Sequence, residues 1–447
     1  MIWNWARWQS RSICTRVRSL SVPPNRTFAS TTIITTIGMS QPYEKEAEFA
    51  VCAVRRACNL TASVFNKLIK NETLVKGDKS PVTVGDFSAQ ALVCTMLANA
   101  FPDDLIVGEE DSADLRQDTA ASRALKDRIV ELANEALTAD LALGDKEQWG
   151  IGPGKARTPD QLLDAIDRGN YDGGRTGRMW TLDPIDGTKG FLRGGQYAVC
   201  LALIVDGEVK VGAIGCPNLH VDAAKPDGEK GCIFVAVRGR GAQQYTLAGA
   251  DPQPLRLPVL PTSQISFLES VEAAHADHGF NARVSEVLGV TLPPVRMDSQ
   301  AKYCCLARGE GGAYLRMPVG TGYREKIWDH APGSVLVEEA GGTISDSRGK
   351  PLDFGLGRTL RENFGKVIEA VQTAVSEGLA KFWRGDPELY YRMYRRCQCR
   401  ALNVCRCVRR VEFSRVRACR SREGGQKRGG DSSFPREGRG TCRIFIG

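Results

Sequence analysis

The sequence predicts a protein of the α+β or α/β class. Apolar residues recur at helical spacing over residues 43–70 and again over residues 78–101. Two pairs of apolar strands follow, at 197–214 and 232–247, and the first pair turns at Asp206-Gly207, a typical hairpin dipeptide. Strands and helices alternate beyond the second pair. We therefore expect a core built from helices packed on β-sheet.

A chain of 447 residues is long enough for two domains with separate cores. The segment 250–262 contains four Pro residues and is the best candidate for a connection between domains. We predict an N-terminal α+β domain at 43–255 and a C-terminal α/β domain at 256–384. Residues 1–42 and 385–447 lie outside both predicted domains.

The net charge of +8 is distributed unevenly along the chain. Residues 1–43 contain five Arg and no acidic residue, and residues 384–447 contain seventeen basic residues against six acidic ones. The intervening body is therefore acidic. This pattern indicates a globular enzyme with two basic appendages rather than a nucleic-acid-binding domain. We expect no nucleic-acid partner and no membrane partner, since no stretch is long and apolar enough for a membrane helix.

The two ends of the chain leave alternatives open. Residues 1–39 are rich in Arg, Ser and Thr, which is typical of a mitochondrial transit peptide, but a disordered start explains them equally well. Met39 could itself begin a cytoplasmic protein, so we predict a cytoplasmic location, or a mitochondrial one through residues 1–39. The tail 385–447 has no regular apolar period and is predicted to be disordered or translated non-coding sequence. The alternative is a tail that binds metal, RNA or acidic lipid.

The fifteen Cys residues are distributed unevenly along the chain, as the charges are. Nine are scattered over the first 305 residues, mostly inside apolar runs, and six crowd into 397–442. The nine show no regular disulfide spacing, which favours a reducing compartment.

The stretch Trp180–Phe191 carries the strongest chemical signal in the chain. An apolar strand ends in Asp183 and Asp186, which flank Pro184-Ile185 and precede Gly187-Thr188. Two carboxylates at the end of a strand repel each other unless a cation lies between them, and hard oxygen ligands suit Mg²⁺. Thr188 could cap a following helix whose free N–H groups attract phosphate. An Asp-Pro-x-Asp-Gly turn without function is the simpler alternative.

Three further acidic residues stand at predicted strand or helix ends: Asp86, Glu109 and Asp329. Each alone has an ordinary structural explanation, because Asp86 and Asp329 could cap helices and Glu109 could form an ion pair. The case for a metal site depends on their combination with Asp183 and Asp186.

The chain resembles the lithium-sensitive, Mg²⁺-dependent phosphomonoesterases, a superfamily that includes inositol monophosphatase, fructose bisphosphatase and the 3′(2′),5′-bisphosphate nucleotidases. The resemblance covers about residues 43–365 and includes Asp183-Pro-Ile-Asp-Gly-Thr188, Gly108-Glu-Glu110 and Trp328-Asp-His-Ala-Pro-Gly333. Three strings are most similar to the fungal bisphosphate nucleotidases: residues 80–86, 187–193 and 297–303. The resemblance implies the layered α-β-α-β-α sandwich of inositol monophosphatase-like sugar phosphatases.

The resemblance also implies that the N-terminal domain binds metal and the C-terminal domain binds substrate, and it implies roles for individual residues. Two or three Mg²⁺ ions would be held by side chains or, for Ile185, the main-chain carbonyl: Glu109, Asp183, Ile185, Asp186 and Asp329. Asp86 and Thr188 would orient the attacking water and help to deprotonate it. Substrate contacts would come from Thr188, His275, Ser299, Lys302 and Arg316.

These roles imply a monomeric phosphatase that removes the 3′-phosphate of adenosine 3′,5′-bisphosphate, and also that of 3′-phosphoadenylyl sulfate. Such an activity belongs to sulfur assimilation and salt tolerance. An inositol mono- or polyphosphate phosphatase is the alternative enzyme, which the set Ser299, Lys302 and Arg316 disfavours. A third hypothesis makes the basic tail a binding module for RNA or membrane and the body inactive.

The chain departs from the superfamily near its end. The predicted helix at 366–371 follows Arg358–Gly365 directly, where members of the superfamily have a last apolar strand before their final helix. We therefore expect the sheet of the C-terminal part to lack one strand.

Overall fold

The computed structural model describes residues 41–67, 73–75, 81–141, 147–249, 252–273, 276–316, 324–346, 350–360 and 443–446. The described residues from Pro42 onward belong to one compact unit. The transit-peptide segment, the predicted helix at 366–371 and the Cys-rich stretch at 397–442 lie outside the described residues. None of the described helices has the length and apolar character needed to cross a bilayer.

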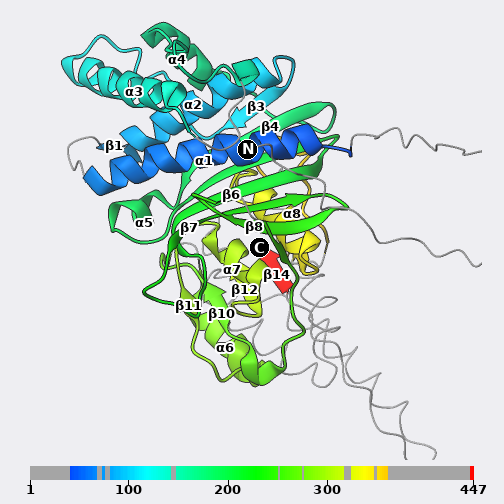
Figure 1. Cartoon of the computed structure of the whole chain (residues 1–447). Helices are drawn as coiled ribbons and strands as arrows, with labels where there is room; N and C mark the ends of the chain where they lie inside the picture. Colours follow the sequence, from blue (N-terminus) through cyan, green and yellow to red (C-terminus); the bar gives the residue numbers. More distant parts are fainter. Residues whose placement is uncertain are drawn as a thin grey trace, which may run out of the picture. The chain divides into compact units, whose positions relative to one another are not determined.

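The first described half of the chain forms one large, mostly antiparallel sheet and the helices on one of its faces (Figure 1). The sheet has the order β3-β4-β5-β6-β7-β8-β9, with β3 parallel to β4 and every other neighbour antiparallel. Its strands are β3 (Leu105–Gly108), β4 (Arg178–Asp186), β5 (Ala198–Val205), β6 (Glu208–His220), β7 (Lys230–Val237), β8 (Gly241–Thr246) and β9 (Gln253–Leu255).

Helices α1 (Glu44–Lys67) and α2 (Val84–Ala100) cover one face of this sheet, and α3 (Ala120–Thr138) and α4 (Pro159–Asp167) pack outside α2 (Figure 1). The short strands β1 (Thr73–Val75) and β2 (Pro81–Thr83) form a two-stranded sheet just before α2. The short helix α5 (Thr188–Leu192) directly follows β4.

The other face of the sheet is covered by α7 (Ala301–Arg308) and α8 (Ala331–Glu339), which also contact a second sheet. This parallel sheet has the order β11-β10-β12-β14-β13, and α6 (His278–Leu288) packs beside β10. Its strands are β10 (Phe267–Glu269), β11 (Val295–Arg296), β12 (Ala313–Arg316), β13 (Thr343–Asp346) and β14 (Arg443–Ile446). The layers are helix, sheet, helix, sheet, helix, which confirms the predicted sandwich.

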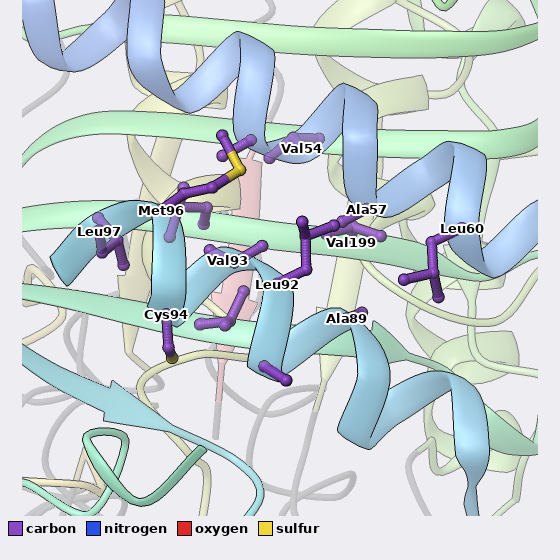
Figure 2. Close-up of a cluster of buried hydrophobic side chains, with 14 of the residues drawn as sticks. Val54, Ala57, Leu60, Ala89, Leu92, Val93, Cys94, Met96, Leu97 and Val199 are labelled. Atoms are coloured by element: carbon purple, nitrogen blue, oxygen red, sulfur yellow. The ribbon is translucent and has the colours of Figure 1, made fainter. Parts of the chain in front are cut away.

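Burial on both faces explains why the central strands read as continuous apolar runs. Along β5, Val199, Leu201 and Leu203 face the core beneath α1 and α2, while Cys200 and Ala202 face the core beneath α7 and α8. Figure 2 shows the first of these cores, where α1 and α2 lie side by side over β5. Eight described Cys residues, among them Cys200, are buried and unbridged, where each behaves as a small apolar side chain.

Most predicted elements are present close to their expected bounds. The hairpin turn at Asp206-Gly207 is confirmed, because both residues have positive φ, at 52° and 78°. The strand that begins at Glu208 extends to His220, beyond the predicted end at residue 214. Part of the Pro-rich segment 250–262 is strand β9, which extends the first sheet at its edge. The predicted boundary near residue 255 stays a prediction.

The expectation that the second sheet lacks a strand is wrong. Residues 443–446, which belong to the tail predicted to be disordered, form β14 between β12 and β13. Ile444 lies opposite Tyr314 on one side and Ile344 on the other. A four-residue strand with high β propensity can occupy this position regardless of its distance along the chain.

Candidate active site

The central motif lies where β4 ends, at a bulge in its pairing with β5. Asp183 lies opposite Cys200 and Asp186 opposite Ala198, so the register shifts between the two acids. Both side chains are brought to the same end of the strand by this irregularity. Gly187 follows with φ 85°, which only glycine adopts without strain.

Four carboxylates converge here: two from β4, one from just after β3 and one from just before α8. One ligand atom each from Asp183, Asp186 and Asp329 lies within 4.8 Å of the others. Glu109, just after β3, shares a hydrogen bond with Asp183. Parallel pairing of β3 with β4 brings Glu109 to this position, because Gly108 lies opposite Leu182. The structure therefore brings together four of the five acidic residues that the sequence motifs singled out: Glu109, Asp183, Asp186 and Asp329.

The burial and mutual repulsion of these carboxylates favour a bound cation. Burial raises the pKa of Asp183 well above its usual range, and the charges of Glu109, Asp186 and Asp329 raise it further. Burial and Asp329 also raise the pKa of Asp186 to about 7, although Lys302 and Arg316 oppose the shift. The Oδ1 atom of Asp183 is buried and accepts no hydrogen bond from the described residues. Charged oxygens left without donors fit a divalent metal ion.

The simpler explanation, a helix cap, is wrong for Asp329. The cap position of α8 is His330, which makes no side-chain cap bond, so Asp329 does not cap that helix. Glu109 shares a hydrogen bond with another acid, Asp183, and also interacts electrostatically with Arg358. Asp86 is buried in the first turn of α2, with 1% of its surface exposed.

The expected cap by Thr188 is wrong. Gly187 occupies the N-cap of α5 and Thr188 is the first helical residue. Its hydroxyl donates instead to the Ile185 carbonyl at 3.2 Å. Helix α5 packs against β2, which runs directly into the first turn of α2 and Asp86. The hydrogen bond to Ile185, which stands between Asp183 and Asp186 in the sequence, thus holds Thr188 next to the acidic cluster.

The residues just before α7 pack closely against Asp186 and Gly187 of the central motif. Ser299 has φ 67° and is nearly buried, and a Cβ added at Gly187 would come within 3.0 Å of its Cβ. The main-chain N–H of Gln300 donates to Asp186. These two contacts join the metal cluster to the residues predicted to bind substrate.

Two cations that we predict to bind substrate lie beside the cluster: Lys302 is buried and the side chain of Arg316 is 12% exposed. Lys302 donates to the carbonyls of Ser299 at 2.7 Å and Met297 at 3.0 Å. Burial lowers its pKa to about 8, with Asp186 opposing and Arg316 reinforcing the shift. Arg316, at the end of β12, lies 3.4 Å from Asp329 through Nη2. His275 lies outside the described residues.

A group that the sequence motifs missed is Glu325. Its carboxylate accepts from Arg316 at 2.9 Å and from His330 at 2.8 Å. Burial alone would raise its pKa, but Arg316 and His330 outweigh burial and lower it to about 2. An acid four residues before Asp329, within a short charged run that precedes Ile327-Trp328, was the available signal.

Comparison with known proteins agrees with this arrangement. The pattern of the inositol monophosphatase family matches residues 43–380. The chain belongs to the inositol monophosphatase family. This membership confirms the superfamily expected from the motifs, and enzymes of the inositol monophosphatase family are generally metal-dependent.

Two curated relatives within the inositol monophosphatase family are fungal. A 3′(2′),5′-bisphosphate nucleotidase of Schizosaccharomyces pombe is 50% identical over 353 residues, which cover 75% of this chain and 97% of the relative. A protein of the same name from Emericella nidulans is 47% identical and covers 76% and 98%. Among solved structures, the Thermotoga maritima IMPase is 19% identical with a TM-score of 0.44, covering 74% of this chain and 98% of that one.

Proposed function

We propose that this chain is a Mg²⁺-dependent phosphomonoesterase that converts adenosine 3′,5′-bisphosphate to AMP and phosphate. Its sulfated parent, 3′-phosphoadenylyl sulfate, would be hydrolysed in the same way. The observation that supports this proposal most directly is the presence of four clustered carboxylates and two neighbouring cations, Lys302 and Arg316, in one site. The names of the fungal relatives support the same substrate class.

The metal-binding role falls to the carboxylates of Glu109, Asp183, Asp186 and Asp329, with the Ile185 carbonyl as a neutral ligand. When bound, Mg²⁺ supplies charge neutralisation for the phosphate and lowers the pKa of a bound water. The chain itself supplies the geometry, because the β4 bulge fixes two of the acids on a strand and the parallel β3–β4 pair fixes a third directly after β3.

Asp86 and Thr188 would orient the attacking water. A carboxylate can accept a proton from water, and a Thr hydroxyl can accept a second hydrogen bond while it donates to Ile185. Burial of Asp86 keeps bulk water away from its carboxylate. No covalent enzyme intermediate is required by this arrangement.

The second phosphate of the substrate would be bound by Ser299, Lys302 and Arg316, and His275 would contact the nucleoside. A phosphate dianion gains charge-assisted hydrogen bonds from an ammonium and a guanidinium group. An inositol monophosphate has no second phosphate to pair with these cations. We therefore favour a doubly phosphorylated nucleotide over inositol phosphates.

A substrate panel tests this assignment. With Mg²⁺ present, we expect kcat/KM for adenosine 3′,5′-bisphosphate to exceed that for adenosine 3′-monophosphate and that for inositol 1-phosphate by at least about a hundredfold, about 2.7 kcal/mol of added transition-state binding. Phosphate release measures all three. Faster turnover of inositol 1-phosphate would replace the nucleotidase assignment by the inositol phosphatase alternative.

The metal assignment predicts a pH-dependent effect on stability. Because folding raises the pKa of Asp183 and Asp186, the metal-free protein loses stability as the pH rises from about 4 through about 7 and these buried acids ionise. Metal ions bind the ionised form, so Mg²⁺ should raise the melting temperature more at pH 8 than at pH 5.5. In the variant Asp183→Asn, Mg²⁺ should raise the melting temperature less than it does in the native sequence. Equal stabilisation of the native sequence at both pH values would contradict the assignment.

A further inference from the structure

A buried chain of polar side chains runs from α7 to the end of β12. The Tyr303 hydroxyl is 2.8 Å from His330 Nδ1, and His330 Nε2 is 2.8 Å from a Glu325 oxygen. Glu325 then accepts from Arg316 Nε at 3.1 Å and from Nη2 at 2.9 Å. Tyr303 and His330 are at most 1% exposed, and the Glu325 side chain is 9% exposed. Each member is held by the next, so the chain is a rigid connection.

The Glu325 carboxylate binds two nitrogens of the guanidinium group, which is the strongest geometry available to this pair. Arg316 Nη2 lies between two acids, at 2.9 Å from Glu325 and 3.4 Å from Asp329. Of these two acids, Glu325 is therefore the stronger partner of Arg316. Without it, the guanidinium group would move onto Asp329, a carboxylate that the proposed function assigns to metal.

The chain also connects the two cations of the substrate side. Tyr303 is the neighbour of Lys302 on α7, and Arg316 is the last residue of β12. Lys302 Nζ lies 5.4 Å from the centre of the Tyr314 ring, and Tyr314 shares a hydrogen bond with Arg316. The relative placement of both cations thus depends on groups that do not themselves face the substrate.

We propose that Glu325 is a positioning residue that sets specificity for substrates with a second phosphate, by keeping the contact of Arg316 with Asp329 long and holding Arg316 in place for that phosphate. This inference rests on the proposed function. Glu325 and His330 are occupied by each other and by Arg316. They do not form a second metal site with Asp329, although one ligand atom from each of the three lies within 4.8 Å of the others.

The experiment measures one ratio, kcat/KM for adenosine 3′,5′-bisphosphate over kcat/KM for adenosine 3′-monophosphate. In Glu325→Gln the amide keeps the shape of the side chain but loses the charge that holds Arg316. We expect the ratio to fall at least about tenfold, mainly through a higher KM for the bisphosphate. In the background of Arg316→Ala the same change should lower the ratio no further, because Glu325 acts through Arg316.

Glu338→Gln is the matched control. It makes the same change in a partly exposed ion pair with Arg238, at 2.6 Å on α8, and should leave the ratio unchanged. If Glu325→Gln lowers both rates equally, or if its effect adds to that of Arg316→Ala, the positioning role is overturned.

Tyr303→Phe covers the case in which Glu325→Gln does not fold. It removes one hydroxyl from the far end of the chain and keeps the ring that packs edge-on against Tyr314. We expect a fall of about two- to fivefold in the same ratio, and an unchanged ratio would overturn the inference. A native ratio near one would overturn the proposed substrate and this inference together, whereas a high native ratio retained in Glu325→Gln would overturn the inference alone.

Discussion

Replacing Asp183 by Asn is expected to lower phosphate release at least about a thousandfold while making the metal-free protein more stable to heat. Asp183 is buried among Glu109, Asp186 and Asp329, so its charge is costly unless a cation compensates it. Two like charges 4 Å apart repel by about 4 kcal/mol at an effective dielectric constant of 20. Asn removes this repulsion and, with it, a charged metal ligand worth several kcal/mol in the transition state.

The two effects have opposite signs, which makes the test specific. General damage to the fold would lower activity and the melting temperature together. Asp127→Asn is the matched control, because Asp127 is exposed on α3 and the change should affect neither quantity. Phosphate release and thermal melting without metal measure both outcomes. An Asp183→Asn enzyme that retains its rate and its dependence on Mg²⁺ would remove Asp183 from the proposed metal site.

The acidic cluster could be predicted from sequence because most of its residues belong to short motifs of neighbouring residues. Asp183 and Asp186 stand three residues apart at the end of one strand, and Glu109 follows another apolar strand. The parallel pairing of β3 with β4, which the sequence does not reveal, then brings Glu109 to Asp183. The residue types predicted the chemistry, and the sheet order supplied the convergence.

The role of Glu325 could not be predicted in the same way. Its partners Arg316 and His330 come from a strand end and a helix start, and their mutual distances depend on how α7, α8 and β12 pack. A charged residue in a short charged run is usually solvent-exposed, and nothing in the local sequence marks this one as buried. Such residues become visible only through tertiary contacts.

The position of β14 could not be predicted from local sequence either, because its partner strands are far away along the chain. Ile444 is separated by about 100 residues from its partner Ile344 in β13, and the intervening composition predicted disorder. The local sequence sets the β propensity of residues 443–446. It does not show that a strand is needed between β12 and β13, because that position depends on how the rest of the sheet is arranged.

Replacing Ile444 by Pro is expected to destabilise the second sheet by about 1–3 kcal/mol, the cost of leaving a hydrogen-bonding partner unsatisfied. Ile444 lies in a strand with neighbours on both sides, opposite Tyr314 and Ile344. Proline has no N–H group to donate to a neighbouring strand, and it is tolerated essentially only at sheet edges. Thermal melting of the full chain measures the loss, and Ile444→Val, which keeps the N–H group and a β-branched side chain, is the matched control.

The same substitution should also affect the proposed substrate site. Arg316 is the last residue of β12 and lies opposite Ile446 of β14, so loosening this pairing would release the strand end that presents the guanidinium group. We expect a higher KM for adenosine 3′,5′-bisphosphate at temperatures where the protein is still folded. Identical melting of the Pro and Val variants would show that the tail contributes nothing to the sheet, and the fold would then have to be stable with β12 and β13 unpaired along their facing edges.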